Sequence, residues 1–360
     1  MFCPSALTVM QYATLEKRVL AFQRDPAHDT FDAVLGDVVR YQQQFNPALA
    51  RYWKGRGFDA FRDNPADVPA VPTDVFRHVR LASTEAEPTR VFRTSGTTNG
   101  ARGEHWRLSL DAYVQGARDF FADMTGLAPG SCGFIKLVFD PDVVTDSSLS
   151  FMVQQLEQTF AADRSAWLLN VDGADIAGFD AALQKADRPM VVFGTAFGFA
   201  HLLDNWQPKG RLPAGSIVVE TGGFKGKSRE VPREELYAWF ETALGCAPER
   251  CLSEYSMSEL SSQLYTRGIE LGRPTAVYRA PHWLRVRAVD PMTLQPLPAG
   301  ETGLLRFDDL ANTDSVVAIQ TSDLGRVTVD GVELYGRAPG ATPRGCSLAV
   351  EEIIARRDAP

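Results

Sequence analysis

The stretch SIVVETGGFKGKS, residues 216–228, places an apolar run directly before a loop rich in glycine and lysine. The run Ser216–Glu220 predicts a buried strand, and the next helix is expected to begin near Pro232. Other short apolar runs alternate with helical segments on both sides of this stretch: Thr30–Phe45, Asp111–Met124 and Ser150–Phe160 as helices, and Phe134–Phe139, Trp167–Val171 and Met190–Phe193 as strands. This alternation predicts an α/β fold with a largely buried sheet.

After about Arg273 the pattern of alternating helices and strands gives way to closely spaced strands. Short strand-like runs follow one another there, separated by turns such as Asp330-Gly331: Trp283–Val289, Gly303–Phe307, Val316–Thr321, Arg326–Val329 and Val332–Tyr335. They predict a small β-rich subdomain. The expected domains are an α/β core at residues 1–270, the β-rich subdomain at 271–336, and a hinge with a short tail at 337–360.

Composition excludes several classes of protein. The 360 residues carry a formal net charge of −8 and no basic stripe, so nucleic-acid binding is not expected. The five cysteines contain no CxxC pair, which argues against a disulfide framework or a structural zinc site. No apolar run is long enough to span a membrane, and no secretory signal is recognisable. The expected location is the reducing cytoplasm.

A first candidate segment, Arg93–Gly100, reads RTSGTTNG and follows the apolar pair Val91-Phe92. Glycine lets the backbone approach an anion closely, and successive N–H groups and hydroxyls can surround phosphate oxygens. A plain surface turn has the same composition. The segment is therefore a candidate phosphate loop whose identity needs further support.

A second candidate segment is Thr221–Ser228, the glycine and lysine loop quoted above. It nearly matches the P-loop pattern that ends in Lys227-Ser228, but Thr221 stands where the first glycine is required. A β-branched residue resists the backbone angles that glycine allows. A P-loop NTPase and a solvated loop with two lysines both remain open from these residues alone.

A third candidate segment is Ser253–Leu260. Tyr255 could stack on a base, Ser258 could bind a phosphate oxygen, and Glu259 could hold Mg²⁺, which prefers oxygen ligands. The alternative is a helix N-terminus with capping serines and a favourable acid. These residues alone do not choose between the two.

Two further candidates lie near the end of the chain. Asp323, at an expected strand end, could bind both ribose hydroxyls, and Gly336-Arg337 follows it; a turn aspartate is the alternative. Cys346 follows Arg344 closely, which favours a thiolate, and a small buried cysteine is the alternative.

The order and spacing of these segments resemble the adenylate-forming superfamily of acyl-CoA synthetases, luciferases and peptide-synthetase adenylation domains. The resemblance implies ATP and Mg²⁺ as cofactors. It implies that the hydroxyl loop binds ATP phosphates, the glycine pair lines adenine, and the later aspartate holds ribose. The implied ATP-binding residues are Ser95, Gly96, Thr97, Thr98, Gly222, Gly223, Tyr255, Ser258, Asp323 and Arg337.

Within that superfamily the sequence resembles the LuxE-like acyl-protein synthetases most closely, over Val71–Arg77, Ser95–Thr98 and Arg344–Leu348. The implied fold is a large N-terminal domain of α/β layered subdomains plus a small β-rich subdomain, without the mobile C-terminal domain of a full synthetase. Asn99–Arg102 departs from the usual glycine, proline and lysine, which leaves the role of that lysine unassigned here.

The activity implied by this resemblance is ATP-dependent activation of a carboxylic acid, of the fatty acid class, followed by transfer to a cysteine thiol. Thr94, Glu259 and Cys346 are the implied catalytic residues, with Glu259 as the metal ligand. The partner would be an acyl reductase or another acyl-accepting protein. Transfer to CoA, a carrier protein or an amine is an alternative, as are a P-loop NTPase and a non-catalytic ATP- or acyl-binding subunit.

The acyl pocket is expected at Phe193–Phe199, because small residues there would leave space between aromatic rings. The residues proposed to line it are Phe193, Gly194, Ala196, Phe197 and Gly198. The same segment resembles a GxSxG nucleophile motif, but Ala196 stands where the serine is required, so a hydrolase of that class is disfavoured.

Overall fold

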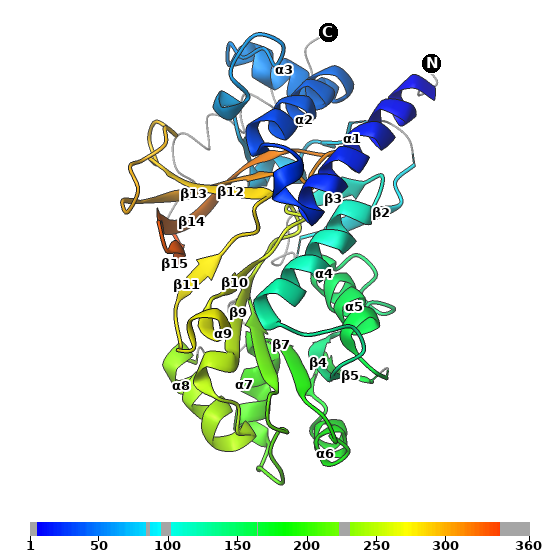
Figure 1. Ribbon diagram of the computed structural model, residues 1–360, viewed down its shortest axis with the longest axis vertical. Helices are drawn as coiled ribbons and strands as arrows, with labels where there is room; N and C mark the ends of the chain where they lie inside the picture. Colours follow the sequence, from blue (N-terminus) through cyan, green and yellow to red (C-terminus); the bar gives the residue numbers. More distant parts are fainter. Residues whose placement is uncertain (1–5, 84–86, 95–101, 164, 223–230, 339–360) are drawn as a thin grey trace. The chain divides into compact units, whose positions relative to one another are not determined.

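The computed structural model describes residues 6–83, 87–94, 102–163, 165–222 and 231–338 (Figure 1). The chain forms two compact units. The first contains the described parts of Met1–Gly116, Met257–Ser262 and Ala280–Pro360, and the second contains those of Ala117–Ser256 and Gln263–Arg279. Each unit is thus assembled from separate stretches of chain, and the linear boundaries expected at residues 270 and 336 stay a prediction.

The second unit is built on a mainly parallel sheet. Strands β5, β4, β7, β8 and β9 lie side by side in parallel, and β6, β10 and β11 add antiparallel pairs at its ends. Their bounds are β4 Gly133–Phe139, β5 Trp167–Asn170, β6 Gly173–Ala174, β7 Met190–Thr195, β8 Ile217–Thr221, β9 Cys251–Tyr255, β10 Leu264–Thr266 and β11 Val277–Arg279. The predicted α/β class and its buried strands are confirmed.

Helices pack on both faces of this sheet. On one face, aromatic residues of α6, α7 and the π-helical turn after α8 share a core with β4, β7 and β8. On the other face, Lys136 of β4 pairs with Glu157 of α5, and Phe120 and Phe121 of α4 pack on Tyr265 of β10. The bounds are α4 Asp111–Thr125, α5 Ser148–Phe160, α6 Ile176–Gln184, α7 Ala196–Asn205, α8 Arg233–Trp239, the π-helical turn Phe240–Leu244 and α9 Gly268–Leu271.

The first unit contains an antiparallel sheet in the order β12-β13-β14-β15, to which β1 adds a short parallel pairing with β14. The bounds are β1 Val71–Pro72, β12 Leu284–Val289, β13 Thr302–Asp309, β14 Ala318–Thr328 and β15 Gly331–Arg337. The β-rich texture was predicted, but two expected strands are one. β14 continues through Ser322–Gly325, because β13 and β15 supply pairing partners on both sides.

The described first unit also contains three α-helices and a separate hairpin: α1 Ala6–Arg24, α2 Phe31–Phe45, α3 Pro47–Gly55, and β2 Arg90–Arg93 paired with β3 Glu104–Arg107. Short 3-10 helices occupy Pro26–His28, Pro65–Asp67 and Thr73–Arg77. The helix predicted at Thr30–Phe45 is confirmed, and the Thr30 hydroxyl caps it by accepting from the N–H of Ala33. Gln42 of α2 donates to the carbonyl of Asn312 at 2.7 Å. This bond ties α2 to the loop between β13 and β14.

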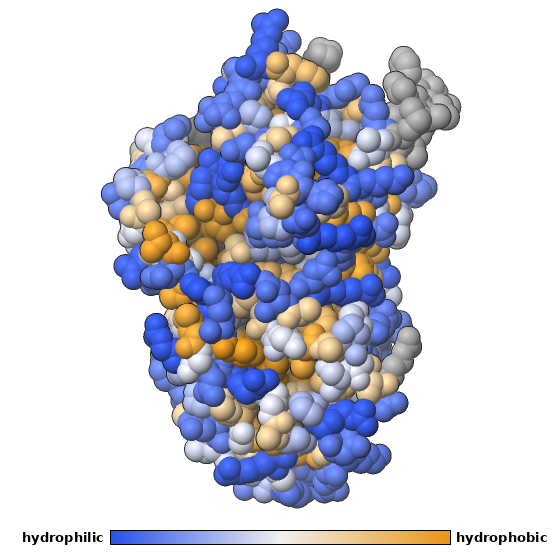
Figure 2. Space-filling view, viewed as in Figure 1, coloured by the Kyte–Doolittle hydropathy of each residue, from blue (hydrophilic) through white to orange (hydrophobic). Residues whose placement is uncertain are grey.

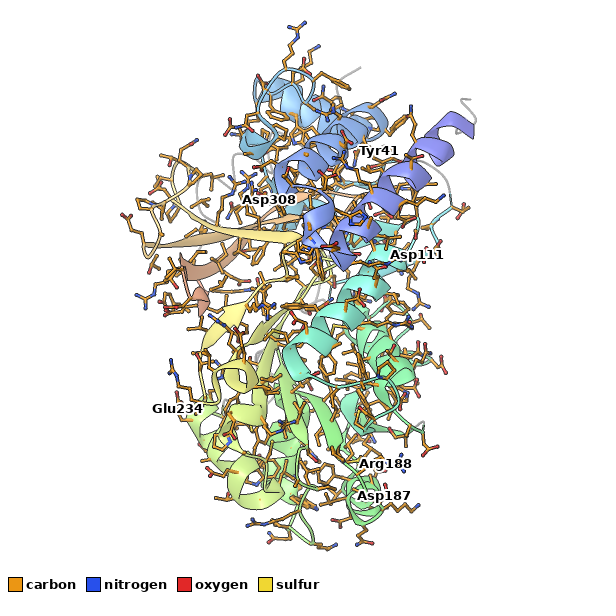
Figure 3. The ribbon with its side chains drawn as sticks, viewed as in Figure 1. Tyr41, Asp111, Asp187, Arg188, Glu234 and Asp308 are labelled. Carbon is orange, nitrogen blue, oxygen red and sulfur yellow. The ribbon has the colours of Figure 1, made fainter. Side chains whose placement is uncertain are left out.

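Buried charge is paired in the first unit. Asp308 of β13, labelled in Figure 3, is fully buried, accepts from Arg306 at 3.0 Å and also pairs with Arg287.

Hydrophilic residues cover much of the face shown in Figure 2, interrupted by apolar ones. In the part of the chain that the structure describes, every helix is too short or too polar to cross a membrane.

Candidate functional site

The hydroxyl-rich segment is carried by the β2–β3 hairpin. Thr94 closes the hairpin, since its N–H donates to the carbonyl of Gly103 at 2.9 Å and its Oγ1 accepts from the N–H of Gly103 at 2.9 Å. Among the described residues, this arrangement leaves the Thr94 hydroxyl hydrogen as a donor for a ligand. The predicted phosphate residues Ser95, Gly96, Thr97 and Thr98 lie outside the described residues.

A cavity of about 430 Å³ lies at the base of this hairpin. Its lining is rich in arginine: Phe76, Arg77, His78, Val79, Arg80, Arg93, Arg102, Glu104 and Trp106. Arg93 is paired with Glu104 at 2.9 Å, and the Arg80 guanidinium stacks on the Trp106 ring at 4.0 Å. Four guanidinium groups against one carboxylate favour an anionic occupant.

Glu259 is a buried acid of the first unit, with an exposed fraction of 7%. Burial raises the pKa of Glu259 to about 7, while the charges of Arg337 and Arg77 oppose that rise. The Glu259 carboxyl is thus poorly hydrated and lies in the field of two positive charges. A nearby cation would stabilise its carboxylate form, as expected of a metal ligand.

The backbone around Glu259 is fixed by a buried polar network. Asn312 donates to the carbonyl of Glu259 at 2.8 Å, and Asp309 accepts from the N–H groups of Ser261 and Ser262 at 2.9 and 3.0 Å. Asn312 also accepts from the Ser261 hydroxyl at 2.6 Å. Since Asp309 and Asn312 are wholly buried, these bonds hold the segment in one conformation.

His105 supports the same segment from β3. Its Nδ1 contacts the carbonyl of Ser258, and Arg107 lies 3.4 Å from its Nε2. Burial, with the charge of Arg107, lowers the pKa of His105 to about 3. The ring is therefore neutral, so Nδ1 donates to Ser258 and Nε2 accepts from Arg107.

Sequence reasoning missed this support. His105 is one of five histidines and has no other candidate catalytic residue beside it in the sequence, and the run from Asp308 to Ser315 has the composition of a solvated turn. In the structure the whole run is buried, and Arg107 pairs with Asp314 at 3.2 Å inside it. The density of Asp, Asn, Thr and Ser over eight positions was the signal available in the sequence.

Asp323 and Arg337 face each other across β14 and β15. They are register partners, and Arg337 Nε lies 3.3 Å from Asp323 Oδ1. The expectation of a strand end at Asp323 is wrong, because the residue lies inside β14 beside a register irregularity. The ribose role of Asp323 stays a prediction.

The second unit carries the glycine and tyrosine segments. Gly222 follows β8 with φ of +73°, an angle that favours glycine. Tyr255 ends β9 and pairs with Leu264. Thr221 belongs to β8, so this position is strand rather than the start of a P-loop. Gly223, Lys227 and Ser228 lie outside the described residues.

The expected acyl pocket is packed in this structure. Phe193 is fully buried in β7, Ala196 is buried at the start of α7, and Phe197 is half-buried. A Cβ on Gly194 would lie 2.7 Å from the Phe199 ring, and one on Gly198 would lie 2.8 Å from the Leu137 carbonyl. The reasoning that these glycines leave open space is therefore wrong, since they let α7 approach the sheet. The pocket assignment itself stays a prediction.

The described cysteines are all buried: Cys132, Cys246 and Cys251. Burial raises the pKa of the Cys132 thiol to about 11, which disfavours its thiolate. Cys3 and Cys346 lie outside the described residues, so the acceptor role of Cys346 is untested by this geometry.

Comparison with known proteins gives a consistent assignment. The family model "Acyl-protein synthetase, LuxE" matches residues 6–355. A "Long-chain-fatty-acid--luciferin-component ligase" of Aliivibrio fischeri is 34% identical over 80% of this chain and 79% of its own length. The protein of the same name from Vibrio harveyi is 21% identical over 89% of this chain and 86% of its own length.

A solved structure shares the fold. A 2-hydroxyisobutyryl-CoA ligase, in an open conformation with 2-HIB-AMP and CoA, matches with a TM-score of 0.63 and 16% identity. The match covers 87% of this chain and 76% of that one. At this identity it assigns the fold alone, which is that of adenylate-forming ligases and agrees with the predicted large N-terminal domain.

Proposed function

Since the chain belongs to the LuxE acyl-protein synthetase family, we propose that it uses ATP to activate a fatty acid as an acyl-adenylate and passes the acyl group to a cysteine thiol. Cys346 is the proposed acceptor. The long-chain fatty acid comes from the names of the two ligase relatives. An acyl reductase is the proposed partner that receives the acyl group from Cys346.

The observation that carries this proposal is the environment of Glu259. A single carboxyl is buried on a backbone held by Asn312, and the charges of Arg77 and Arg337 act on it. Arg93 and Arg102, at either end of the hydroxyl loop, line the arginine cavity. Anionic phosphates and a cation are the ligands whose charges match these groups.

A magnesium ion fits this donor set. Among the described residues there is no cluster of three or more acidic, histidine or cysteine side chains that could enclose a metal. A metal that arrives with ATP needs few protein ligands, because phosphate oxygens and water complete its coordination. Glu259 would hold it, and when bound it would neutralise charge on the phosphates.

Two bond exchanges make up the proposed reaction. A carboxylate oxygen of the acid attacks the α-phosphorus of ATP, and pyrophosphate leaves with the electrons of the broken P–O bond. The Cys346 thiolate then attacks the acyl carbon, and AMP leaves as the thioester forms. Before the first step the acid and ATP are both anions, so positioning by Thr94 and the arginines lowers its barrier.

Acid-dependent exchange of pyrophosphate into ATP tests the first step. The proposal expects exchange with fatty acids, and a loss of roughly 10²-fold in Glu259→Gln, as for other key electrostatic contacts. Glu234→Gln, an exposed acid in the first turn of α8, is the control and should match the wild type. Release of phosphate instead of pyrophosphate, with Lys227 essential, would mean that the chain is a P-loop NTPase.

Mass analysis tests the second step. After incubation with ATP, Mg²⁺ and an accepted acid, the acyl group should be found on the Cys346 peptide and be released by hydroxylamine. Cys346→Ser should keep pyrophosphate exchange and lose the adduct. An adduct elsewhere, or transfer only to added CoA, a carrier protein or an amine, would contradict the cysteine step and leave adenylation intact.

A further inference from the structure

Three polar side chains form a row at the carboxyl edge of the second unit's sheet. The register pairs Thr195 of β7 with Thr221 of β8, and Thr221 with Glu254 of β9. Cross-strand partners point to the same face of a sheet, so the three side chains share one face at the point where the parallel strands end. Ligands of open α/β sheets bind outside this edge.

The row directly beneath is apolar. Phe193, Val219 and Leu252 lie two residues earlier on the same strands, on the same face, and each is fully buried. The polar row therefore lies at the rim of a packed apolar layer. A ligand outside this edge meets the polar row first, so a polar substituent on the ligand matches this position.

Glu254 is the member of the row whose hydrogen bonding is incomplete. Its side chain accepts from the Thr221 hydroxyl through Oε2. Its Oε1 has no hydrogen-bond partner among the described residues, although Glu254 is only 3% exposed. Burial raises the pKa of Glu254 to about 7, against the hydrogen bonds of Thr221 and Ser256. A buried oxygen left without a donor is rare in proteins and calls for a ligand.

Glu220, on β8, is an acid that has both an ion-pair partner and hydrogen-bond donors. It precedes Thr221 and so faces the opposite side of the sheet, where it pairs with Arg233 at 3.8 Å. Burial raises the pKa of Glu220, while Arg233 and hydrogen bonds from Ser253 and Tyr237 oppose the rise. Burial alone therefore does not distinguish the two acids. The missing donor at Glu254 does.

The edge beside Glu254 has room on the side of the glycine segment. Gly222 follows Thr221 directly, and a Cβ built on it meets none of the described atoms within 4 Å. Among the described residues, no atom keeps a substrate group from coming close to the end of β8, next to the Thr221–Glu254 bond.

We propose that Glu254 is a specificity-determining residue whose free oxygen accepts a hydrogen bond from a hydroxyl or amino group of the acid that is activated. This inference rests on the proposed function, and it narrows the substrate from a plain fatty acid to one that carries a hydrogen-bond donor. A donor on the substrate supplies the bond that Oε1 lacks. An unsubstituted alkyl chain leaves that oxygen buried and unpaired, which a site of this kind penalises.

Pyrophosphate exchange with paired acids tests the inference. At saturating ATP, tetradecanoic acid is compared with its 2-, 3- and 14-hydroxy derivatives. In a second pair, dodecanoic acid is compared with 12-aminododecanoic acid. The wild type should favour a donor-bearing acid by about tenfold or more in kcat/KM. Glu254→Leu should bring that ratio to within about threefold of unity, and Glu254→Gln, which keeps an accepting oxygen, should retain most of it.

Glu220→Gln is the matched control, because it changes a buried acid on the opposite face and should leave the ratio unchanged. The inference is overturned if the wild type prefers the unsubstituted acids, or if Glu254→Leu keeps the wild-type ratio. It is also overturned if Glu254→Leu raises the KM for ATP and leaves acid preference intact, since the oxygen then contacts the nucleotide. Absence of exchange with every acid in the wild type would instead defeat the proposed function itself.

Discussion

Replacement of His105 by asparagine separates its hydrogen bond from its titration. The side-chain amide of asparagine can place a donor where Nδ1 of His105 donates to the carbonyl of Ser258. It cannot take up a proton. The change should therefore preserve the conformation of the segment that carries Glu259, while removing one cause of instability in acid.

The magnitude follows from the pKa of His105. It is about 3 in the folded protein, and the ordinary value is 6.5. Between those values the unfolded chain binds a proton that the folded chain excludes, so stability falls as the pH falls below 6.5. At pH 5, about 1.5 units below the ordinary value, the wild type should have lost about 2 kcal/mol through this group. At pH 7.5 the loss should be negligible.

Urea unfolding at pH 7.5 and pH 5 measures the effect. The free energy of unfolding of His105→Asn, minus that of the wild type, should rise by about 2 kcal/mol from the higher to the lower pH. An equal difference at both pH values for His105→Asn would mean that the folded protein accommodates the charged ring.

Three further substitutions test the packing. Asn312→Ala removes four hydrogen bonds from the buried network and should lower the free energy of unfolding by about 4 kcal/mol in urea titrations, with exchange activity falling too. Gly198→Ala brings a Cβ to 2.8 Å from a backbone carbonyl and should cost about 2 kcal/mol, whereas Gly210→Ala, with contacts of 3.5 Å or more, should be nearly neutral. Lys136→Met leaves Glu157 buried without its cationic partner and should lower the free energy of unfolding by about 3 kcal/mol. The added change Glu157→Leu should restore much of that free energy. A neutral Asn312→Ala, an equal effect of the two glycine changes, or no recovery in the double variant would contradict the respective packing argument.

Periodicity predicted the second unit well because its strands and helices each carry their own signal. The run Ser216–Glu220 has three consecutive apolar residues at its centre, as expected of a strand covered on both faces, and β8 occupies Ile217–Thr221. In the β-rich part the signal failed locally. Ser322–Gly325 has turn composition, and only the partners on β13 and β15 make it strand. Tertiary pairing there outweighs local preference.

The sequence predicts the candidate site where the functional side chains are close together along the chain. Ser258 and Glu259 could be singled out because a hydroxyl, an acid and an aromatic ring occur within five positions. The residues that fix them could not. His105 precedes Ser258 by 153 positions, and Asn312 follows Glu259 by 53. No local pattern connects residues so far apart, so only the fold reveals that they act together.

The same reasoning explains why the glycines of β7 and α7 were misread. A glycine in a sequence shows only that a side chain is missing, and the missing volume can be left open or filled by a neighbour. At Gly194 and Gly198 the neighbours are Phe199 and Leu137. Close packing of interiors makes the filled outcome the common one. At Gly222 the described residues leave space open, because Gly222 follows the last residue of β8 at the carboxyl edge of the sheet.

Strand register gives Glu220 and Glu254 different hydrogen-bond and ion-pair partners. Glu220 and Glu254 both lie in apolar strands, and nothing in their local sequence separates them. One residue of offset places Glu220 opposite Ser253 and Thr221 opposite Glu254, on different faces of the sheet. Glu220 has an arginine and hydroxyl groups as partners, whereas Glu254 has only hydroxyl groups, those of Thr221 and Ser256, among the described residues. The difference in their partners is thus a property of the pairing between β8 and β9, so substitutions of the two acids should separate substrate selection from folding.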